Sequence, residues 1–173
     1  METTHLGDTG IEVSRIGLGL AALGRPGYIN LEHADDLSKN YEVDAMRDNA
    51  HAVLDAAYDA GVRYFDTARA YGKGEVFLAS WLKKRDLKPG DVLVSSKWGY
   101  TYTADWQVNA ATHEVKEHSL GMLQRQWRES KEILADYINI YQIHSATLDT
   151  GVLQNRDVLI ELAKMKEENI RIG

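Results

Sequence analysis

Apolar and polar positions near the start of the chain predict strands and turns. Two short stretches, Thr4 to Leu6 and Ile11 to Val13, flank the turn sequence GDTG and predict a β-hairpin. The run RIGLGL that follows predicts a buried strand ending near Leu20. Glycine, proline and mixed polar residues dominate from Ala21 to Glu42, which predicts a long loop, and long loops in compact domains often have a function.

Four later segments carry apolar residues at helical spacing. The first predicted helix begins near Val43 or Asp44 and stops at Gly61, and the second is closed by the sequence KPGD. The predicted inward faces are Met46, Ala50, Val53 and Ala57; Val76, Ala79 and Leu82; Leu120, Leu123, Trp127, Ser130 and Leu134; and Val158, Leu159, Leu162, Ala163 and Met165.

Short apolar and β-branched runs separate these helices. They are VRYFDT, VLVSSK from Val92 to Lys97, YINIYQIH, and IRIG at the end of the chain. Strands and helices alternate four times, and the strands are too apolar to have a solvated face, so the pattern predicts an α/β fold with a parallel sheet and outer helices. We find no repeat and no linker, and expect residues 1–173 to form a single domain.

Composition narrows the function classes. The 173 residues are 44% hydrophobic and 27% charged, with a formal net charge of −6 and scattered basic residues, which argues against a nucleic-acid partner. The absence of cysteine excludes disulfides, thiolate catalysis and thiolate zinc sites. The polar N-terminus METTHLGDTG and the lack of a long apolar run predict a cytoplasmic protein with no membrane partner.

Ionisable residues lie at the ends of three predicted strands. Asp66 closes the second strand, Lys97 the third and His144 the fourth, while Tyr71 lies in the loop after the second. The carboxyl ends of parallel strands converge, so we expect all four side chains to face the same opening.

Each of these residues also has a purely structural interpretation. An aspartate before threonine is commonly a helix cap or turn former, and a lone tyrosine, lysine or histidine commonly packs, is solvated or forms a structural hydrogen bond. The combination at successive strand ends makes coincidence the weaker explanation.

Such a group suits the protonation of a carbonyl oxygen. A phenol has a pKa near 10 and becomes a useful acid–base catalyst near neutral pH once its anion is stabilised by roughly 4 kcal/mol. An ammonium about 4 Å away supplies roughly that amount at an effective dielectric of about 20, and Lys97 is the candidate. Burial would favour loss of the lysine proton, and Asp66 would oppose that loss. His144 could orient the carbonyl oxygen or help pass the proton.

The chain resembles the aldo-keto reductases at several motifs in order. They are LGDTGIEVSRIGLG, AAYDAGVRYFDTARAYGKGE, VLVSSKWG, HSLGMLQRQWRES and DYINIYQIHS. The resemblance implies a (β/α)8 barrel, NADPH or alternatively NADH as cofactor, and a small aldehyde or ketone substrate. It places the family's catalytic tetrad on Asp66, Tyr71, Lys97 and His144, with Tyr71 as proton donor. The implied cofactor contacts include Asp66 and Leu20, although family members often carry a hydroxylated residue where Leu20 and Ala21 follow Gly19.

The expected fold is the N-terminal half of this TIM-barrel type, with about four βα units, the start of a fifth strand and the N-terminal hairpin. A full barrel takes roughly 250 residues, and in the family most residues that bind the cofactor come from the second half of the barrel. A half-barrel would leave unpaired strand edges and an uncovered inner face, so we expect self-association or a missing second half. Two alternatives to an active reductase are a catalytically incompetent interaction or vestigial module, and a regulatory subunit that binds cofactor without turnover.

Other motifs are set aside. The glycines of GLGLAALG are spaced wrongly for a dinucleotide loop, and NLEHADD lacks the ligand pattern of a calcium loop. His113 and His118 are five residues apart, which would separate them by about 140° on a helix, so we expect surface or capping roles and no metal site. An aromatic cluster beside Lys97 has two open interpretations, packing or a substrate pocket; it comprises Trp98, Tyr100, Tyr102 and Trp106.

Overall fold

The computed structural model describes residues 1–27 and 40–173, and its centre is a parallel β-sheet. The sheet has five strands in the order β3-β4-β5-β8-β9, and every neighbouring pair is parallel. The predicted alternation of strands and helices is therefore confirmed for the described residues. The strands are β3 (Leu18–Gly19), β4 (Tyr64–Asp66), β5 (Leu93–Trp98), β8 (Ile138–Ile143) and β9 (Arg171–Ile172).

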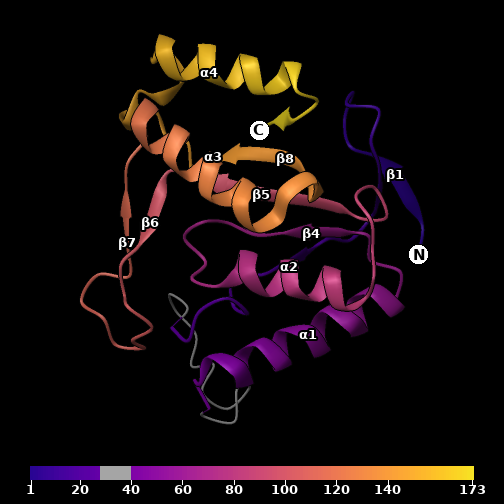
Figure 1. Cartoon of the computed structure of the whole chain (residues 1–173). Helices are drawn as coiled ribbons and strands as arrows, with labels where there is room; N and C mark the ends of the chain where they lie inside the picture. Colours follow the sequence, from indigo (N-terminus) through magenta and orange to yellow (C-terminus); the bar gives the residue numbers. More distant parts are fainter. Residues whose placement is uncertain (28–39) are drawn as a thin grey trace.

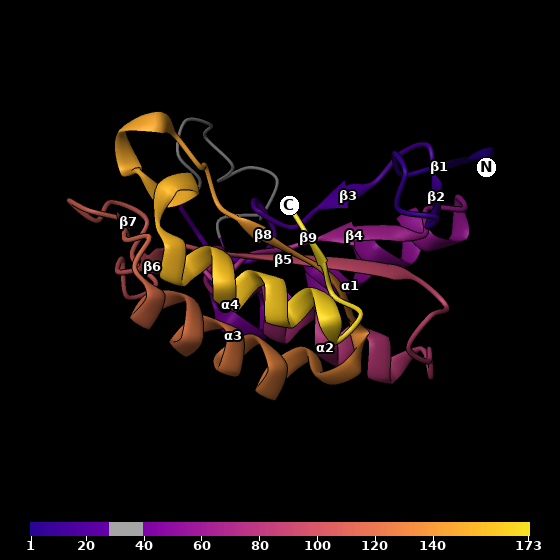
Figure 2. The ribbon, with the colours of Figure 1, turned by 90° about the horizontal axis from the view of Figure 1, so that it is seen from above.

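The described residues form four α-helices. These helices cover one face of the sheet, as Figures 1 and 2 show. Each helix follows a strand and returns the chain to the amino end of the next one. The helices are α1 (Val43–Asp59), α2 (Gly74–Lys84), α3 (Leu120–Leu134) and α4 (Arg156–Glu167), and three short 3-10 turns are η1 (Ala135–Tyr137), η2 (Leu148–Thr150) and η3 (Val152–Gln154).

The main hydrophobic core lies between this helical layer and the sheet. Phe65 of β4 and Trp81 of α2 are fully buried, with ring centroids 5.1 Å apart. On the next strand pair, the ring of buried Tyr141 lies 4.8 Å from that of Trp127 in α3. Burying a large apolar side chain stabilises the fold by roughly 1.5–3 kcal/mol, so these contacts fix the helices on the sheet.

The inward helical faces differ from the prediction in detail. Val76 is 45% exposed, because α2 instead turns the larger Phe77 and Trp81 into the core. In α1 the buried stripe runs through Leu54, whereas Val53 is only partly buried. Leu159 of α4 is 41% exposed. Spacings of three and four residues fit two adjacent helical faces, and side-chain volume selects between them.

The predicted N-terminal hairpin is confirmed with a shift of one residue at each strand. Strands β1 (Thr3–His5) and β2 (Glu12–Ser14) are antiparallel, and the hydroxyl of Ser14 accepts a hydrogen bond from the backbone N–H of Arg63 at 2.9 Å. Since Arg63 precedes β4, the hairpin lies at the amino ends of the sheet strands. The following strand is shorter than predicted, and Ile16 is 61% exposed.

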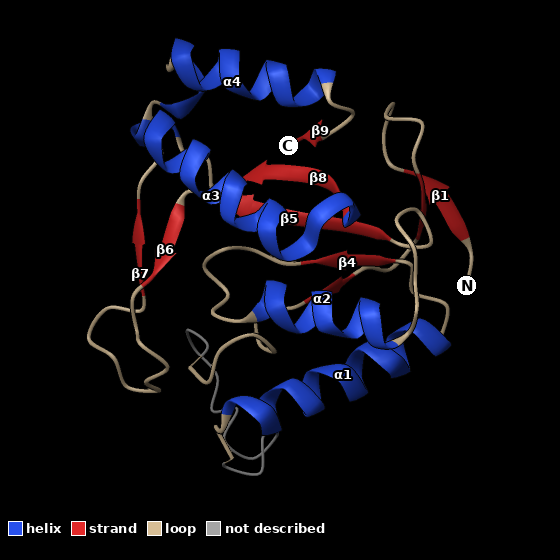
Figure 3. Ribbon diagram, viewed as in Figure 1, coloured by secondary structure: helices blue, strands red, loops and turns tan. Residues whose placement is uncertain are grey.

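A second hairpin, which the sequence pattern did not predict, follows β5. Strands β6 (Tyr100–Tyr102) and β7 (Glu114–Lys116) pair antiparallel and extend beyond the carboxyl end of β5, as Figure 3 shows. His113 and His118 therefore flank a strand, and both are partly buried. The His118 ring packs so closely over Gly99 (φ 111°) that a Cβ at that glycine would lie 2.3 Å from it.

GLGLAALG forms a turn in which the N–H groups of Leu23 and Gly24 donate to the carbonyl of Leu20, at 3.1 and 3.0 Å. NLEHADD lies outside the described residues. Within residues 1–27 and 40–173, no helix is long and apolar enough to cross a membrane. Across the same ranges, no three histidine, cysteine, aspartate or glutamate side chains gather where they could hold a metal ion.

Candidate active site

The sheet order brings the four candidate residues, three at strand ends and one in a loop, to the same edge of the sheet. Asp66 is the last residue of β4, Lys97 lies one residue before the end of β5, and His144 follows β8. These strands are neighbours in the sheet. Tyr71 lies in the loop of residues 67–73, which connects β4 to α2. Parallel pairing therefore places side chains from three separate strand ends and one loop next to one another.

Lys97 is the centre of this group. Its Nζ donates to the carboxylate of Asp66, to the carbonyl oxygen of Thr67 at 3.0 Å and to the hydroxyl of Tyr71 at 3.5 Å. Burial lowers the pKa of Lys97 from its ordinary value, and the charge and hydrogen bond of Asp66 act in the opposite direction. The ion pair thus favours the charged ammonium beside the phenol.

The carboxylate of Asp66 is held in place by neighbouring strands. Its Oδ1 accepts hydrogen bonds from the Ser95 hydroxyl at 2.6 Å and from the Gln142 amide at 3.2 Å. Ser95 and Gln142 each lie two residues before a candidate, Lys97 and His144 respectively, and alternate strand residues share a face. Neither residue was predicted from the sequence, although this period of two could have identified both.

Tyr71 and His144 meet edge to face. Their ring centroids lie 5.5 Å apart with an interplanar angle of 87°. Burial, followed by the charge of Lys97, lowers the pKa of His144 to about 4. The imidazole is therefore neutral at physiological pH and can orient a carbonyl oxygen or relay a proton.

Residues from the β6–β7 hairpin and from the loop after it contact His144. Nε2 of His118 donates to the backbone carbonyl of His144 at 3.0 Å, and the ring of Tyr100 lies 4.9 Å from the His144 ring. Of the four clustered aromatics, Tyr100 borders the candidate site. Trp98 is fully buried, Tyr102 packs near Arg25, and Trp106 packs against Phe77, so for these three the packing interpretation describes their contacts.

The loop that carries Tyr71 is packed against the turn after β3. A Cβ added to Gly24 would lie 2.1 Å from the carbonyl oxygen of Tyr71, so only glycine permits this approach. Nη1 of the buried Arg25 donates to the carbonyl of Ala70 at 3.0 Å and to Glu114 of β7 at 2.8 Å. Arg25 therefore joins the turn, the Tyr71 loop and the β6–β7 hairpin.

A groove of about 540 Å³ opens on the sheet face opposite the helices, next to these residues. Asp66, Lys97 and Gln142 line it, together with residues of the N-terminal hairpin. Leu20 does not line it; its side chain is fully buried in the hydrophobic core. The N–H of Leu20 donates to the carbonyl of Asp66 at 2.8 Å, which joins the turn after β3 to the end of β4, and the expected cofactor contact of Leu20 stays a prediction.

The fold and the site together define a class of protein. It is an α/β protein with a phenol, an ammonium–carboxylate pair and a neutral imidazole at the carboxyl edge of a parallel sheet. Such a set can give or take a proton at an oxygen atom. The residues that carry this chemistry come from the strand ends, as in enzymes built on βα units.

Residues 15–168 match the model of the aldo/keto reductase family, and the chain belongs to this family. It is 27% identical over 164 residues to the aldo-keto reductase YhdN of Bacillus subtilis, covering 94% of this chain and 43% of YhdN. It is also 36% identical over 104 residues to the pyridoxal 4-dehydrogenase of Microbacterium luteolum, covering 59% of this chain and 25% of that enzyme.

Solved structures agree on the fold. The structure of PA4992 from Pseudomonas aeruginosa aligns with a TM-score of 0.71 and 29% identity, over 99% of this chain and 57% of that one. The holo form of the aldo-keto reductase AKR11C1 from Bacillus halodurans aligns with a TM-score of 0.70 and 23% identity, over 100% and 50%. The fold is therefore of the TIM-barrel α/β type, and the chain spans about half the length of these relatives.

Proposed function

We propose that this chain carries the proton-handling site of an NAD(P)H-dependent reductase that converts an aldehyde or ketone to an alcohol. The observation that carries the proposal is the position of the Lys97 ammonium, 3.5 Å from the Tyr71 hydroxyl and paired with Asp66. Family membership supports it, because relatives that cover most of this chain include named aldo-keto reductases. NADPH is the proposed cofactor, with NADH as the alternative, and a reducing, cytoplasmic setting suits a chain without cysteine.

The proposed roles follow from charge and position. Tyr71 donates its proton to the carbonyl oxygen of the substrate, and Lys97 stabilises the phenolate that remains. Asp66 keeps Lys97 charged, while the neutral imidazole of His144 orients the carbonyl oxygen. These roles make Tyr71, Lys97, Asp66 and His144 the proposed catalytic residues.

The residues around the groove fit the reacting end of a nicotinamide cofactor. The groove has a volume of about 540 Å³, and its wall near the site offers the Gln142 amide, the Lys97 ammonium and the Asp66 carboxylate to polar groups. When bound, the cofactor would supply the hydride. We propose that Asp66 contacts the cofactor at this end.

A steady-state assay with NADPH and a panel of aldehydes and ketones tests the proposal. We expect Tyr71→Phe to lower kcat by about 100-fold or more and to leave NADPH binding intact, because the phenol acts only on the proton. The matched control is Tyr137→Phe, since the Tyr137 hydroxyl donates a hydrogen bond to the carbonyl of Leu87, away from the candidate site. Equal turnover by Tyr71→Phe and wild type would rule out the assigned acid.

A second proposal is that residues 1–173 form a half-barrel domain, of about four βα units and the start of a fifth strand, that has no turnover by itself. Its support is an apolar groove of about 480 Å³ beside β9 and α4, lined by Ile143, Leu162 and Ile172 among others. Contiguous apolar surface of this kind marks an interface. We propose that a second copy of the chain or a complementary half-barrel covers it.

Fluorescence titration with NADPH separates the two proposals. Saturable binding that is lost in Asp66→Ala and Lys97→Ala supports the reductase. A well-folded chain that does not bind NADPH supports the incompetent module, and binding without turnover indicates a regulatory subunit.

A further inference from the structure

Behind the candidate site lies a buried carboxylate with no role in the proposed chemistry. Glu75, near the start of α2, is 2% exposed. Its Oε1 accepts hydrogen bonds from the hydroxyls of Ser96 and Ser130, both at 2.6 Å, and its Oε2 is 2.5 Å from Nη1 of Arg69. A buried carboxylate is costly unless it is paired and fully hydrogen-bonded, so this arrangement depends on Arg69.

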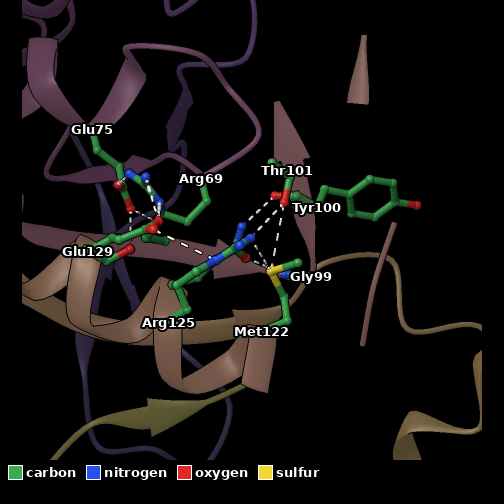
Figure 4. Close-up of polar contacts among 11 residues, drawn as sticks. Arg69, Glu75, Gly99, Tyr100, Thr101, Met122, Arg125 and Glu129 are labelled. Carbon is green, nitrogen blue, oxygen red and sulfur yellow. Dashed lines mark hydrogen bonds and ion pairs between the residues drawn. The ribbon is translucent and has the colours of Figure 1, made fainter. Parts of the chain in front are cut away.

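Arg69 lies two residues before Tyr71 in the loop of residues 67–73. Its guanidinium contacts Glu75 on one side and Glu129 of α3 on the other, at 2.8 Å from Nη2, and Figure 4 shows it between these two carboxylates. Its backbone N–H donates to the carbonyl of Lys97 at 3.1 Å. One residue thus ties the loop both to the helical layer and to the strand that carries the central lysine.

The partners of Glu75 and the candidate residues occupy opposite faces of the same strand. Ser96 and Lys97 are consecutive in β5, so their side chains point to opposite sides of the sheet. Ser96 reaches Glu75 on the helical side, and Lys97 reaches Asp66 and Tyr71 on the other. A change in the Glu75 cluster, which comprises Glu75, Arg69, Ser96 and Ser130, would therefore displace both Lys97 and the Tyr71 loop.

The contacts continue to the hairpin that borders His144. Arg125 of α3 lies 3.8 Å from Glu129 and donates to the hydroxyl of Thr101 in β6 at 3.1 Å, as Figure 4 shows. The next residue of the helix is Gln126, whose side chain accepts from the N–H of Gly99 and donates to the carbonyl of Tyr100, both at 2.8 Å. This side of the cluster fixes the strand whose Tyr100 contacts His144.

We propose that Arg69 and Glu75 are positioning residues, which keep the Tyr71 side chain in contact with Lys97 and His144. The contacts of this pair end on the Tyr71 loop and on β5, which carry candidate residues, and on α3, which supports β6. The inference rests on the proposed function, because it concerns Tyr71 as the acid. It assigns Arg69 and Glu75 no contact with substrate or cofactor.

An NMR contact tests the positioning role without requiring turnover. In the full chain with labelled aromatic residues, we expect a nuclear Overhauser cross-peak between the Tyr71 and His144 rings, whose centroids lie 5.5 Å apart. Arg69→Met should abolish this cross-peak, because Glu75 loses its cation and the loop is released. Arg69→Lys should restore part of it by returning the charge. Glu75→Gln, which keeps the shape of the side chain and removes the charge that pairs with Arg69, serves as a second variant with the same expected loss if Arg69→Met does not fold.

Arg85→Met is the matched control. Arg85 caps the other end of α2 and pairs with Asp59 at 2.7 Å. The substitution therefore removes an arginine ion pair from the end of the same helix, away from the candidate site. The control should keep the cross-peak. A folded Arg69→Met or Glu75→Gln variant with the wild-type cross-peak would overturn the inference and leave the cluster a purely stabilising role.

Kinetics give a second readout that separates this inference from the proposed function. If the wild type turns over, Arg69→Met should lower kcat by about 100-fold with little change in KM, since a displacement of about 1 Å has such an effect. If the wild type does not turn over, the proposed function fails, while the cross-peak still decides whether Arg69 positions Tyr71. Unchanged kcat in Arg69→Met would contradict the inference.

Discussion

At the scale of single residues, the charge state of Lys97 is set by two opposing effects. Burial lowers its pKa, and Asp66 raises it. We predict that Asp66→Asn lowers the pKa of Lys97 further, because the amide removes the opposing charge and leaves the burial. The measurement is an NMR titration of the lysine Nζ signal, assigned with Lys97→Met.

Ser95→Ala is the control for this titration. It removes a neutral hydrogen bond to Asp66 and keeps the carboxylate. A midpoint for Lys97 that is the same in Asp66→Asn and wild type would contradict the assigned role of Asp66.

His144 makes stability depend on pH. Its pKa falls to about 4 in the folded chain, from 6.5 as the ordinary value. As pH drops below 6.5, the unfolded chain binds a proton that the folded chain does not, so stability is lost between pH 6.5 and about 4 and then levels off. The full difference corresponds to about 3 kcal/mol.

Urea unfolding across this pH range measures the effect. We predict that His144→Gln is less sensitive to acid than wild type, while His5→Gln, at an exposed position in β1, keeps the wild-type dependence. The same slope in wild type and His144→Gln would show that other groups dominate.

At the scale of elements, Gly24 and the Tyr71 loop form a contact that no side chain can enter. A Cβ on Gly24 would meet backbone atoms of Tyr71 and Gly74, at 2.1 and 2.7 Å. We predict that Gly24→Ala destabilises the chain by roughly 1–3 kcal/mol and lowers turnover, because backbone must move to accept the methyl group.

Gly121→Ala provides the comparison. Its nearest neighbour to an added Cβ is the Ser119 hydroxyl at 3.9 Å, and the residue lies in α3, where alanine is favoured. Chemical denaturation should show lower stability for Gly24→Ala alone. Equal stabilities would mean that the loop adjusts freely.

Local patterns account for most of the elements and for the candidate residues at strand ends, but not for the second hairpin. Its strands are three residues each, and residues 103–113 separate them, so no alternation long enough to recognise is present. Glu75, Arg69 and Gln126 were also missed. Their positions depend on which buried polar groups meet across three elements, and this information lies in the tertiary packing. Gln126 alone had a local signal, since it lies on the helical face of Leu123 and Ser130.

At the scale of the whole molecule, the apolar groove beside β9 predicts association. Leu159 lines this groove, and we predict that Leu159→Asp weakens association with a second copy or a complementary half-barrel, because it places a charge in a desolvated contact. Sedimentation velocity measures the change. Val76→Asp is the control, since Val76 has a similar exposure, 45% against 41%, and does not line the groove. A wild-type chain that stays monomeric at all concentrations, and also in the presence of a complementary half-barrel, would contradict the prediction.

The contacts of Arg25 also bear on the order of folding. Arg25 joins Ala70, 45 positions later, and Glu114, 89 positions later. Contacts between distant parts of a chain form late, because loop closure must precede them. In refolding experiments, the circular dichroism signal of the helices should therefore recover before Tyr71 and His144 come together. A chain still emerging from the ribosome would likewise form helices before its candidate site assembles.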